Sequence, residues 1–244
     1  MHNIMSKVEL IPWDPSNEAH FRRMQDQRVS FGWFPPSPSK DKEWHLEARK
    51  AVYWITLSDE FVGKEEALRK HTERHTAERE PILDTAKTIA LVERTPTSKS
   101  FIPIGHVLLD RAPPPVADCV DSPETTIWLK SLYISWALQG SGLGRQAVFA
   151  IEEIASRKPF NAASTALDTI TKEFQGEEWY LRAYYDDLGN GRPKIVNEDW
   201  YQRLGYRIVG KRHDEIPDEK TGGVKIIPLL IMQKQLMIVD KLVV

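Results

Sequence analysis

The stretch that most constrains the fold of this chain is "YISWALQGSGLGRQAVFAIEEIA", residues 133–155. An apolar run typical of a strand enters a loop with three glycines, Gly140, Gly142 and Gly144, and a helical pattern begins at once. Glycines permit tight turns and let backbone N–H groups approach an anion. The helix has an apolar stripe with the spacing of a helix that packs on a sheet: Leu143, Ala147, Ile151 and Ile154. The stretch therefore predicts a strand–loop–helix unit whose loop is a candidate anion site.

Three known types of phosphate-binding loop can be compared with this segment. A P-loop requires Lys-Ser or Lys-Thr after its last glycine, whereas Arg145 and Gln146 follow Gly144, so a P-loop is excluded. The dinucleotide fingerprint G-x-G-x-x-G fits poorly, because the glycines here are spaced G-x-G-x-G. The third template, Q/R-x-x-G-x-G/A, is matched at every position from Gln139 to Gly144.

A second motif lies near the end of the sequence. Residues 200–206 read Trp-Tyr-Gln-Arg-Leu-Gly-Tyr, an aromatic-Tyr-x-x-x-Gly-aromatic signature. Together and in this order, the two motifs resemble those of the GNAT N-acetyltransferase superfamily, and the resemblance spans roughly residues 87–236. It implies an α/β fold of the α+β type: a mixed, mostly antiparallel central sheet flanked by helices, with a bulged, splayed strand at the cofactor site.

The resemblance implies acetyl-CoA as co-substrate and direct attack of a primary amine on the thioester in a ternary complex. It assigns the pantetheine arm to the backbone of Leu132, Tyr133 and Ile134. It assigns the pyrophosphate to the backbone of seven loop residues: Gln139, Gly140, Ser141, Gly142, Leu143, Gly144 and Arg145. Tyr201 matches the tyrosine that protonates the departing thiolate, and a phenol with an ordinary pKa of about 10 keeps its proton at neutral pH. The alternative for Tyr201 is a packing residue that only hydrogen-bonds the cofactor.

Two positions depart from the family pattern. Trp136 stands just after the strand, where a proline is often found, and Lys194 stands where an asparagine often precedes the tyrosine by seven residues. Asn197, four residues before Tyr201, is more simply a helix N-cap. No general base is assigned, and an ordered water is an alternative to three carboxylates that could face the cleft: Glu124, Asp168 and Glu173.

The segment "HTERH" places His71 and His75 four residues apart, a spacing that allows two metal ligands on one helix face. Its glutamate occupies the third position, so the segment is not the H-E-x-x-H motif of zinc proteases. The surrounding residues are charged and expected to be solvated, and no third ligand is evident in the sequence. Cys119 is the only cysteine, which excludes an internal disulfide and a cysteine-rich zinc site. We therefore expect no metal.

The remaining patterns predict one domain over residues 1–244, with a charged helical insertion near 59–84 and a second insertion near 175–195. Helices are expected over residues 14–29, capped by Asp14 or Ser16, and over 40–50, 143–155 and 197–205. Strands are expected over residues 6–13, 87–94, 102–112, 125–134, 164–170, 206–212 and 224–236, with the second and third joined as a hairpin. The aromatic segments "FGWFPP" and 177–187 are candidates to line an acceptor pocket, or, for the second, to cover the sheet.

The chain has 33 basic and 35 acidic residues and a net charge of −2, so its bulk charge attracts neither nucleic acid nor an anionic membrane. Its start lacks the basic-then-apolar order of a signal peptide, and its apolar runs are shorter than the ~20 residues of a membrane helix. We expect a cytoplasmic protein, with a nuclear location left open. The expected acceptor is a small amine or amino-acid-like molecule, or a peptide amine, and a homodimer is left open. The alternatives are a non-catalytic acyl-CoA-binding or interaction module of the same fold and a nucleotide-binding protein.

Overall fold

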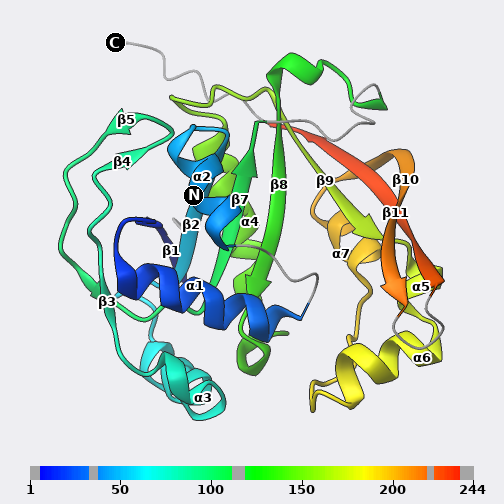
Figure 1. Ribbon diagram of the computed structural model, residues 1–244, viewed down its shortest axis with the longest axis horizontal. Helices are drawn as coiled ribbons and strands as arrows, with labels where there is room; N and C mark the ends of the chain where they lie inside the picture. Colours follow the sequence, from blue (N-terminus) through cyan, green and yellow to red (C-terminus); the bar gives the residue numbers. More distant parts are fainter. Residues whose placement is uncertain (1–5, 33–37, 112–118, 219–222, 237–244) are drawn as a thin grey trace. The chain divides into compact units, whose positions relative to one another are not determined.

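The computed structural model describes four stretches of the chain: residues 6–32, 38–111, 119–218 and 223–236. The chain forms two compact units (Figure 1). Unit 1 comprises residues 1–112 and 129–161, and unit 2 comprises residues 113–128 and 162–244. Strand β8 (Thr126–Ile134) contributes its first three residues to unit 2 and the others to unit 1. No helix in the described stretches is long and apolar enough to cross a membrane.

The sheet of unit 1 has the strand order β1-β2-β7-β8, with β1 (Val8–Pro12), β2 (Lys50–Leu57) and β7 (Gly105–Asp110). β2 runs antiparallel to both β1 and β7. Every residue of β2 after Lys50 and every residue of β7 is buried. Such continuous burial is expected of central strands that are covered on both faces.

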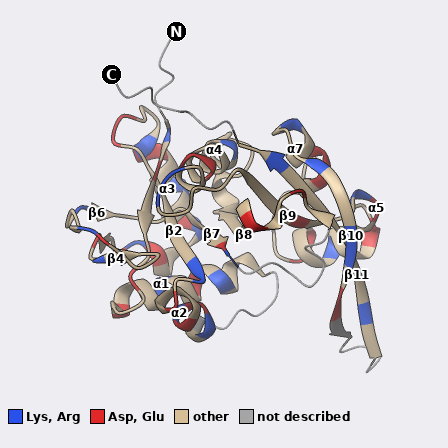
Figure 2. Ribbon diagram, turned by 90° about the horizontal axis from the view of Figure 1, so that it is seen from above, with Lys and Arg blue, Asp and Glu red and all other residues tan. Residues whose placement is uncertain are grey.

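Three helices flank this sheet: α1 (Glu18–Phe31), α2 (Pro38–Leu46) and α4 (Leu143–Ala155). α1 and α2 lie on one face and α4 lies on the other (Figures 1 and 2). The Asn17 side chain caps α1 by accepting hydrogen bonds from the N–H groups of Ala19 and His20. The expected caps, Asp14 and Ser16, are therefore wrong.

Two turns differ from the expected elements because non-glycine residues adopt left-handed backbone. The helix expected over residues 40–50 ends at Leu46, the chain turns at Ala48 with a φ of 56°, and β2 follows, which no pattern in the sequence predicted. The strand expected over residues 87–94 is instead the hairpin of β4 (Thr88–Ile89) and β5 (Val92–Glu93), whose turn residues have φ values of 48° and 64°. β7 consequently pairs with β2 and not with residues 87–94.

The charged segment after β2 forms α3 (Lys64–Arg74), η1 (Thr76–Glu78) and the small β3 (Ile82–Leu83), which pairs with β6 (Ser100–Phe101). The expected exposed helix is present, and its outer side carries ion pairs from Arg69 to Glu66 and Glu73. The expectation that the whole segment is solvated is wrong, because His71 and Glu78 are buried.

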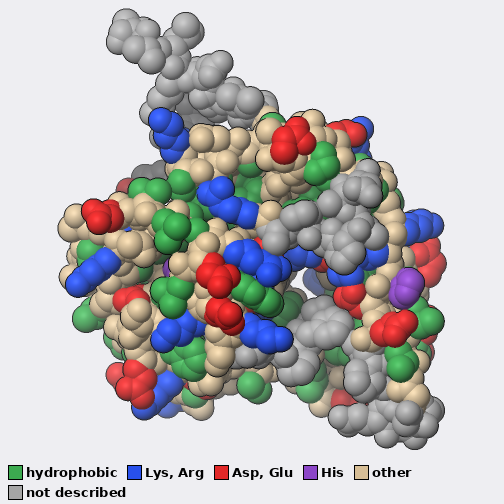
Figure 3. Space-filling view, turned by 45° about the horizontal axis from the view of Figure 1, so that its top comes forward, with side chains coloured by type: hydrophobic (Ala, Val, Ile, Leu, Met, Phe, Trp, Pro, Cys, Tyr) green, Lys and Arg blue, Asp and Glu red, His purple; other side chains and the backbone are tan. Residues whose placement is uncertain are grey.

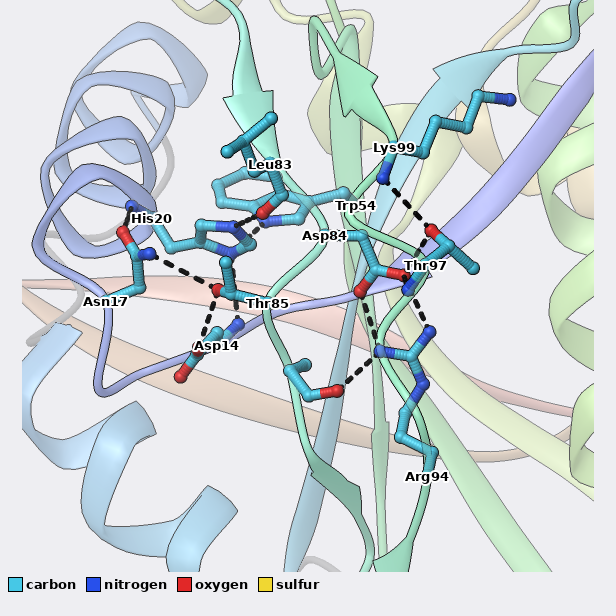
Figure 4. A network of polar contacts seen from close by, with 11 residues as sticks. Asp14, Asn17, His20, Trp54, Leu83, Asp84, Thr85, Arg94, Thr97 and Lys99 are labelled. Carbon is cyan, nitrogen blue, oxygen red and sulfur yellow. Dashed lines mark hydrogen bonds and ion pairs between the residues drawn. The ribbon is translucent and has the colours of Figure 1, made fainter.

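A polar network joins residues 83–99 to the start of α1 (Figure 4). Nδ1 of His20 accepts hydrogen bonds from the Asp14 backbone N–H and the Trp54 indole N–H, each at 3.0 Å. Nε2 of His20 lies 2.8 Å from the Leu83 carbonyl, so we place the ring proton there. Burial lowers the pKa of His20, in agreement with a neutral ring.

Asp84 is the second centre of this network (Figure 4). Both of its carboxylate oxygens accept hydrogen bonds from Arg94, at 2.6 and 2.7 Å, and Oδ2 also accepts one from the backbone N–H of Thr97 at 2.9 Å. These bonds lower the pKa of Asp84 to about 2, against the opposing effect of its burial. The two centres fix the long connection between β3 and β6, which contains the short hairpin of β4 and β5.

Unit 2 contains β9 (Ser164–Ile170), β10 (Arg207–Asp218) and β11 (Gly223–Gln235). β11 lies between the other two strands and is antiparallel to both, while the first residues of β8 pair in parallel with β9. Four short helical segments and one turn of 3-10 helix complete the unit: η3 (Pro123–Thr125), α5 (Lys172–Gln175), α6 (Glu178–Leu181), the π-helical η5 (Arg182–Asp186) and α7 (Asn197–Arg203).

The ladders of β1 with β2, β2 with β7, β9 with β11 and β10 with β11 are antiparallel, and that of β8 with β9 is parallel. The expected fold class is therefore confirmed: a mixed, mostly antiparallel central sheet flanked by helices. The organisation as one domain with two insertions stays a prediction.

Candidate functional site

Strand β8 is irregular directly before the residues expected to bind pantetheine. Ser131 has a φ of 51°, a left-handed conformation inside a strand. Its neighbours Lys130 and Leu132 are partly exposed, whereas Tyr133 and Ile134 are buried. A left-handed residue in a strand is typical of a β-bulge, which interrupts pairing and re-aims the backbone that follows. The splaying of β8 from β9 stays a prediction.

Gly105 of β7 lies against this irregular strand. A Cβ atom at position 105 would lie 2.0 Å from the carbonyl oxygen of Tyr133 and 3.2 Å from Cα of Ile134. No side chain fits at those distances, so only glycine permits this approach of β7 to the backbone of β8. The path of Tyr133 and Ile134, two predicted cofactor contacts, thus depends on a glycine that the sequence motifs do not include.

The loop after β8 needs its glycines for a different reason. Gly140 and Gly142 have φ values of 79° and 83°, in the left-handed region where other L-residues are strained. Both are exposed, and a Cβ on either would have no atom within 4 Å. Gly144 lies in the first turn of α4. The loop is thus sharply turned and unobstructed on its outer side, as a cradle for an anion requires.

Helix α4 begins at this loop without any side-chain cap. Gly142 is its N-cap residue, and its first turn contains no acidic residue. The first N–H bonded within the helix is that of Gln146, to the Gly142 carbonyl at 3.3 Å. The N–H groups of Leu143, Gly144 and Arg145 therefore have no acceptor in the helix, and the positive end of the helix dipole lies with them. Such an N-terminus binds phosphate readily.

Side chains hold the loop in place at several points. Gln139 donates from Nε2 to the Ile134 carbonyl at 3.2 Å, which gives the glutamine of the template a structural role. Trp136, the departure from the family pattern, donates its indole N–H to the carbonyl of Ser30 in the last turn of α1 at 2.8 Å. The Gln146 side chain accepts a hydrogen bond from the backbone N–H of Lys7, just before β1. The predicted pyrophosphate loop is thus attached to three separate elements of unit 1.

Tyr201 lies on α7 of unit 2, in a motif whose geometry explains its spacing. Gly205 follows the helix with a φ of 94°, and the N–H of Tyr206 donates to the Tyr201 carbonyl at 3.1 Å. The Tyr206 hydroxyl lies 2.9 Å from Thr165 Oγ1 of β9, which fixes the end of the motif on the sheet. Burial raises the pKa of Tyr201 above its ordinary value, and the charge of Asp168 contributes to the rise. The phenol therefore stays protonated at neutral pH.

The three unassigned carboxylates differ in their surroundings. Asp168 is not a free base, because Arg212 lies 2.6 Å from its Oδ2. Glu124 and Glu173 are exposed on short helical segments. Asn197 is wrong as an N-cap: Val196 occupies that position, and the Asn197 backbone N–H donates to Gln175 Oε1 at 2.8 Å.

Glu78 is a buried acid near β8 that the sequence did not predict as a site residue. Glu78 of η1 is 1% exposed, and its Oε2 lies 3.6 Å from Nε2 of His71, while its Oε1 lies 3.9 Å from Nδ1 of His75. The only feature of the sequence that could have indicated a role for Glu78 is its position three residues after His75. Among the described residues, no group of three histidine, cysteine or acidic side chains has the arrangement of a metal site.

A pocket of about 310 Å³ lies elsewhere in unit 1, beside the network of Figure 4. Its lining includes Trp13, Asp14, His45 and Thr85, and none of the predicted site residues.

No protein-family model and no curated protein matches this chain. Solved structures that are similar to it include acetyltransferases, the class named by the resemblance of the two motifs. NAA60 of Arabidopsis thaliana in complex with acetyl-CoA shows 11% identity and a TM-score of 0.49, over 93% of this chain and 98% of the other. The ribosomal-protein-S18-alanine N-acetyltransferase of Escherichia coli shows 10% identity and a TM-score of 0.48, over 94% of each chain. The aminoglycoside 6'-N-acetyltransferase of Enterococcus faecium shows 12% identity and a TM-score of 0.47, over 94% and 97%.

Proposed function

We propose that the chain is an acetyl-CoA-dependent N-acetyltransferase of the GNAT superfamily. The observation that carries the proposal is the loop of residues 139–145. It combines two exposed left-handed glycines with an uncapped start of α4. Three backbone N–H groups and the helix dipole converge there on an open surface, and this arrangement suits the pyrophosphate of coenzyme A.

The reaction follows from these parts. The backbone of Leu132, Tyr133 and Ile134 binds the pantetheine arm, and the loop binds the pyrophosphate. A neutral amine attacks the acetyl carbonyl carbon, the N–C bond forms, and the C–S bond breaks. Tyr201 gives its proton to the departing thiolate, a role supported by a raised pKa that keeps the phenol protonated.

A small amine or amino-acid-like molecule is the proposed acceptor, in a soluble cytoplasmic setting. On the face shown in Figure 3, basic and acidic side chains are interspersed, which offers no single-sign surface for a polyanion. The "FGWFPP" segment is residues 31–36, and its residues 33–36 lie outside the described residues. The second aromatic segment has two buried tyrosines, Tyr180 and Tyr185, and Lys225 of β11 lies over the ring of Trp179. This packing favours a cover on the sheet over an acceptor pocket.

The replacement Gly142→Asp tests the loop. It places a carboxylate where the phosphate is expected, and we expect at least a 10-fold rise in the Kd of coenzyme A by calorimetry, with circular dichroism unchanged. The matched control is Gly189→Asp, at an exposed glycine that also has a left-handed φ, 63°, and open space around it. It should leave the Kd unchanged.

Equal affinity in Gly142→Asp and the wild type would contradict the assignment of the cradle. Thiol release from acetyl-CoA across a panel of amines then tests the reaction. Tight binding of coenzyme A without turnover of any amine would favour the non-catalytic module. Binding of ATP or NAD without binding of coenzyme A would favour a nucleotide-binding protein.

A further inference from the structure

Unit 1 contains a buried polar cluster that the motifs do not account for. We call it the Glu78 cluster, and its members are Gln27 of α1, His71 of α3, His75 directly after α3, Glu78 of η1 and His106 of β7. Four of the five side chains are at most 1% exposed. Polar groups are seldom buried so completely unless they are paired or have a function.

Gln27 sets the orientation of the cluster. Its Nε2 donates to Glu78 Oε2 at 2.8 Å and to the Pro103 carbonyl at 3.1 Å, so its Oε1 must accept. The partner of Oε1 is Nδ1 of His106 at 2.9 Å, which therefore carries the ring proton. Nε2 of His106 is consequently an acceptor.

Several polar atoms of this region have no hydrogen-bond partner in the described part of the chain. They are Glu78 Oε1, His75 Nε2, His106 Nε2, Arg23 Nη1 and Ser135 Oγ. Buried donors and acceptors of this kind are commonly bridged by ordered water, which makes about three hydrogen bonds where it is held. The cluster therefore offers both donors and acceptors to bound water.

The charges around Glu78 leave it able to titrate near neutral pH. Arg23 and Asp26 face it from α1 with opposite charges, and His71 of α3 and His75, directly after α3, lie close to its carboxylate oxygens. Burial raises the pKa of Glu78 to about 7 and lowers that of His71 to about 3. The two histidines are thus neutral at pH 7, because burial also lowers the pKa of His75, and Glu78 can take up a proton.

The cluster lies against β8. The rings of His106 and Tyr133 are 5.5 Å apart, and Phe31 lies beside both, with ring centres 6.2 and 5.6 Å away. Burial raises the pKa of Tyr133, and the charge of Glu78 adds to the rise. Ser135, whose hydroxyl is unpaired, is the residue after the strand. The cluster therefore contacts the side chain of Tyr133, a residue whose backbone is expected to hold the pantetheine arm.

We propose that Glu78 takes up the proton that the acceptor amine loses, and that ordered water bound by the Glu78 cluster carries this proton to it. The inference rests on the proposed function. As the amine nitrogen bonds to the acetyl carbon, its proton passes through water to the Glu78 carboxylate. The C–S bond breaks, and the thiolate receives the Tyr201 proton. Afterwards Glu78 returns a proton to solvent and Tyr201 regains one, so the cycle balances.

The test compares Glu78→Gln with the wild type in thiol release from acetyl-CoA, using the best amine of the panel, from pH 5.5 to 9. The wild type should lose activity on the acid side of about pH 7, where Glu78 is already protonated. We expect Glu78→Gln to lower kcat about 10²-fold, to abolish this acid limb and to leave the Kd of coenzyme A unchanged. The matched control is Glu80→Gln, the same change at an exposed side chain two residues away, with the wild-type profile.

The variant Glu78→Asp supplies the conservative comparison and also serves if Glu78→Gln does not fold. It should keep the acid limb with a reduced kcat. Wild-type turnover and an unchanged acid limb in Glu78→Gln would overturn the role of Glu78 while leaving the proposed function intact. No turnover by the wild type with any amine would overturn both. An infrared carboxyl band that is absent from Glu78→Gln and titrates near pH 7 in the wild type would support the proton uptake directly.

Discussion

Single residues of the candidate site are required for different physical reasons. Gly140 and Gly142 are needed for left-handed backbone in open surroundings, so a larger side chain there changes what the loop can bind. Gly105 is needed because Tyr133 lies too close for any side chain. Tyr201 differs from these glycines because its role depends on its pKa, which is raised so that the phenol keeps its proton through neutral pH. Replacements at these positions should therefore affect binding, stability and turnover separately.

The replacement Tyr201→Phe tests the role of this single residue in the reaction. Loss of the acid for the thiolate should lower kcat about 10²-fold, while the Kd of coenzyme A changes less than threefold. Steady-state thiol release and calorimetry measure the two effects. Tyr184→Phe, which removes a phenol outside the motif in the same unit, should behave like the wild type. Unaltered turnover in Tyr201→Phe would leave Tyr201 with a packing role only.

At the scale of elements, the sequence predicted well where a pattern is local. β1, β7, β8, β9 and α4 lie within the expected ranges, because each has a local apolar pattern, and glycine or proline marks an end of β1, β7 and α4. The sequence failed at β2 and at the hairpin of β4 and β5, because their turns use Ala48, Ala90 and Leu91 in left-handed conformations. Nothing in an alanine or a leucine indicates such a turn, and only contacts distant in sequence stabilise it.

The same limit applies to the site. The loop could be predicted because its glycines and its helix are adjacent in sequence. Glu78 could not, because its burial depends on Gln27 and on α3, which pack around it only in the folded chain. Asp168 likewise reads as a free acid until Arg212 is found beside it.

The contact between β7 and β8 gives a prediction about stability. In Gly105→Ala, the new Cβ would overlap the carbonyl of Tyr133, which is backbone and cannot rotate away. We expect the free energy of unfolding in urea to fall by about 1–3 kcal/mol, as for other overpacked cores. Gly191→Ala, where a Cβ would have no atom within 4 Å, should change it by less than about 1 kcal/mol. An equal effect in the two variants would rule out the close approach.

At the scale of the whole molecule, the buried acid and its histidines couple stability to pH in opposite directions. Glu78 binds its proton more tightly in the folded state, so its contribution is complete below pH 4.5 and is lost as the pH rises to about 7. His71 holds its proton less tightly, so its contribution is complete above pH 6.5 and is lost as the pH falls towards 3. Where both groups titrate, Glu78 makes the free energy of unfolding fall with rising pH, whereas His71 makes it rise.

The replacement Glu78→Gln removes the part of the pH dependence of stability that comes from Glu78. Its free energy of unfolding should exceed that of the wild type increasingly from pH 4.5 to about 7, by an amount on the order of 3 kcal/mol at the upper end. Urea denaturation at a series of pH values measures the difference, with Glu80→Gln as the control. A difference that does not vary with pH would contradict the raised pKa. Together with the kinetic test, this would make Glu78 a residue that costs stability and supports turnover.

The hydrogen bond from Lys7 to Gln146 joins positions that are 139 residues apart in the chain. During synthesis, β1 can pair with β2 early, but this hydrogen bond cannot form until most of unit 1 has left the ribosome. Contacts of such long separation slow folding, because a long stretch of chain must be ordered before they form. The proposed anion-binding loop, which directly precedes Gln146, would then be among the last parts of unit 1 to be assembled on the nascent chain.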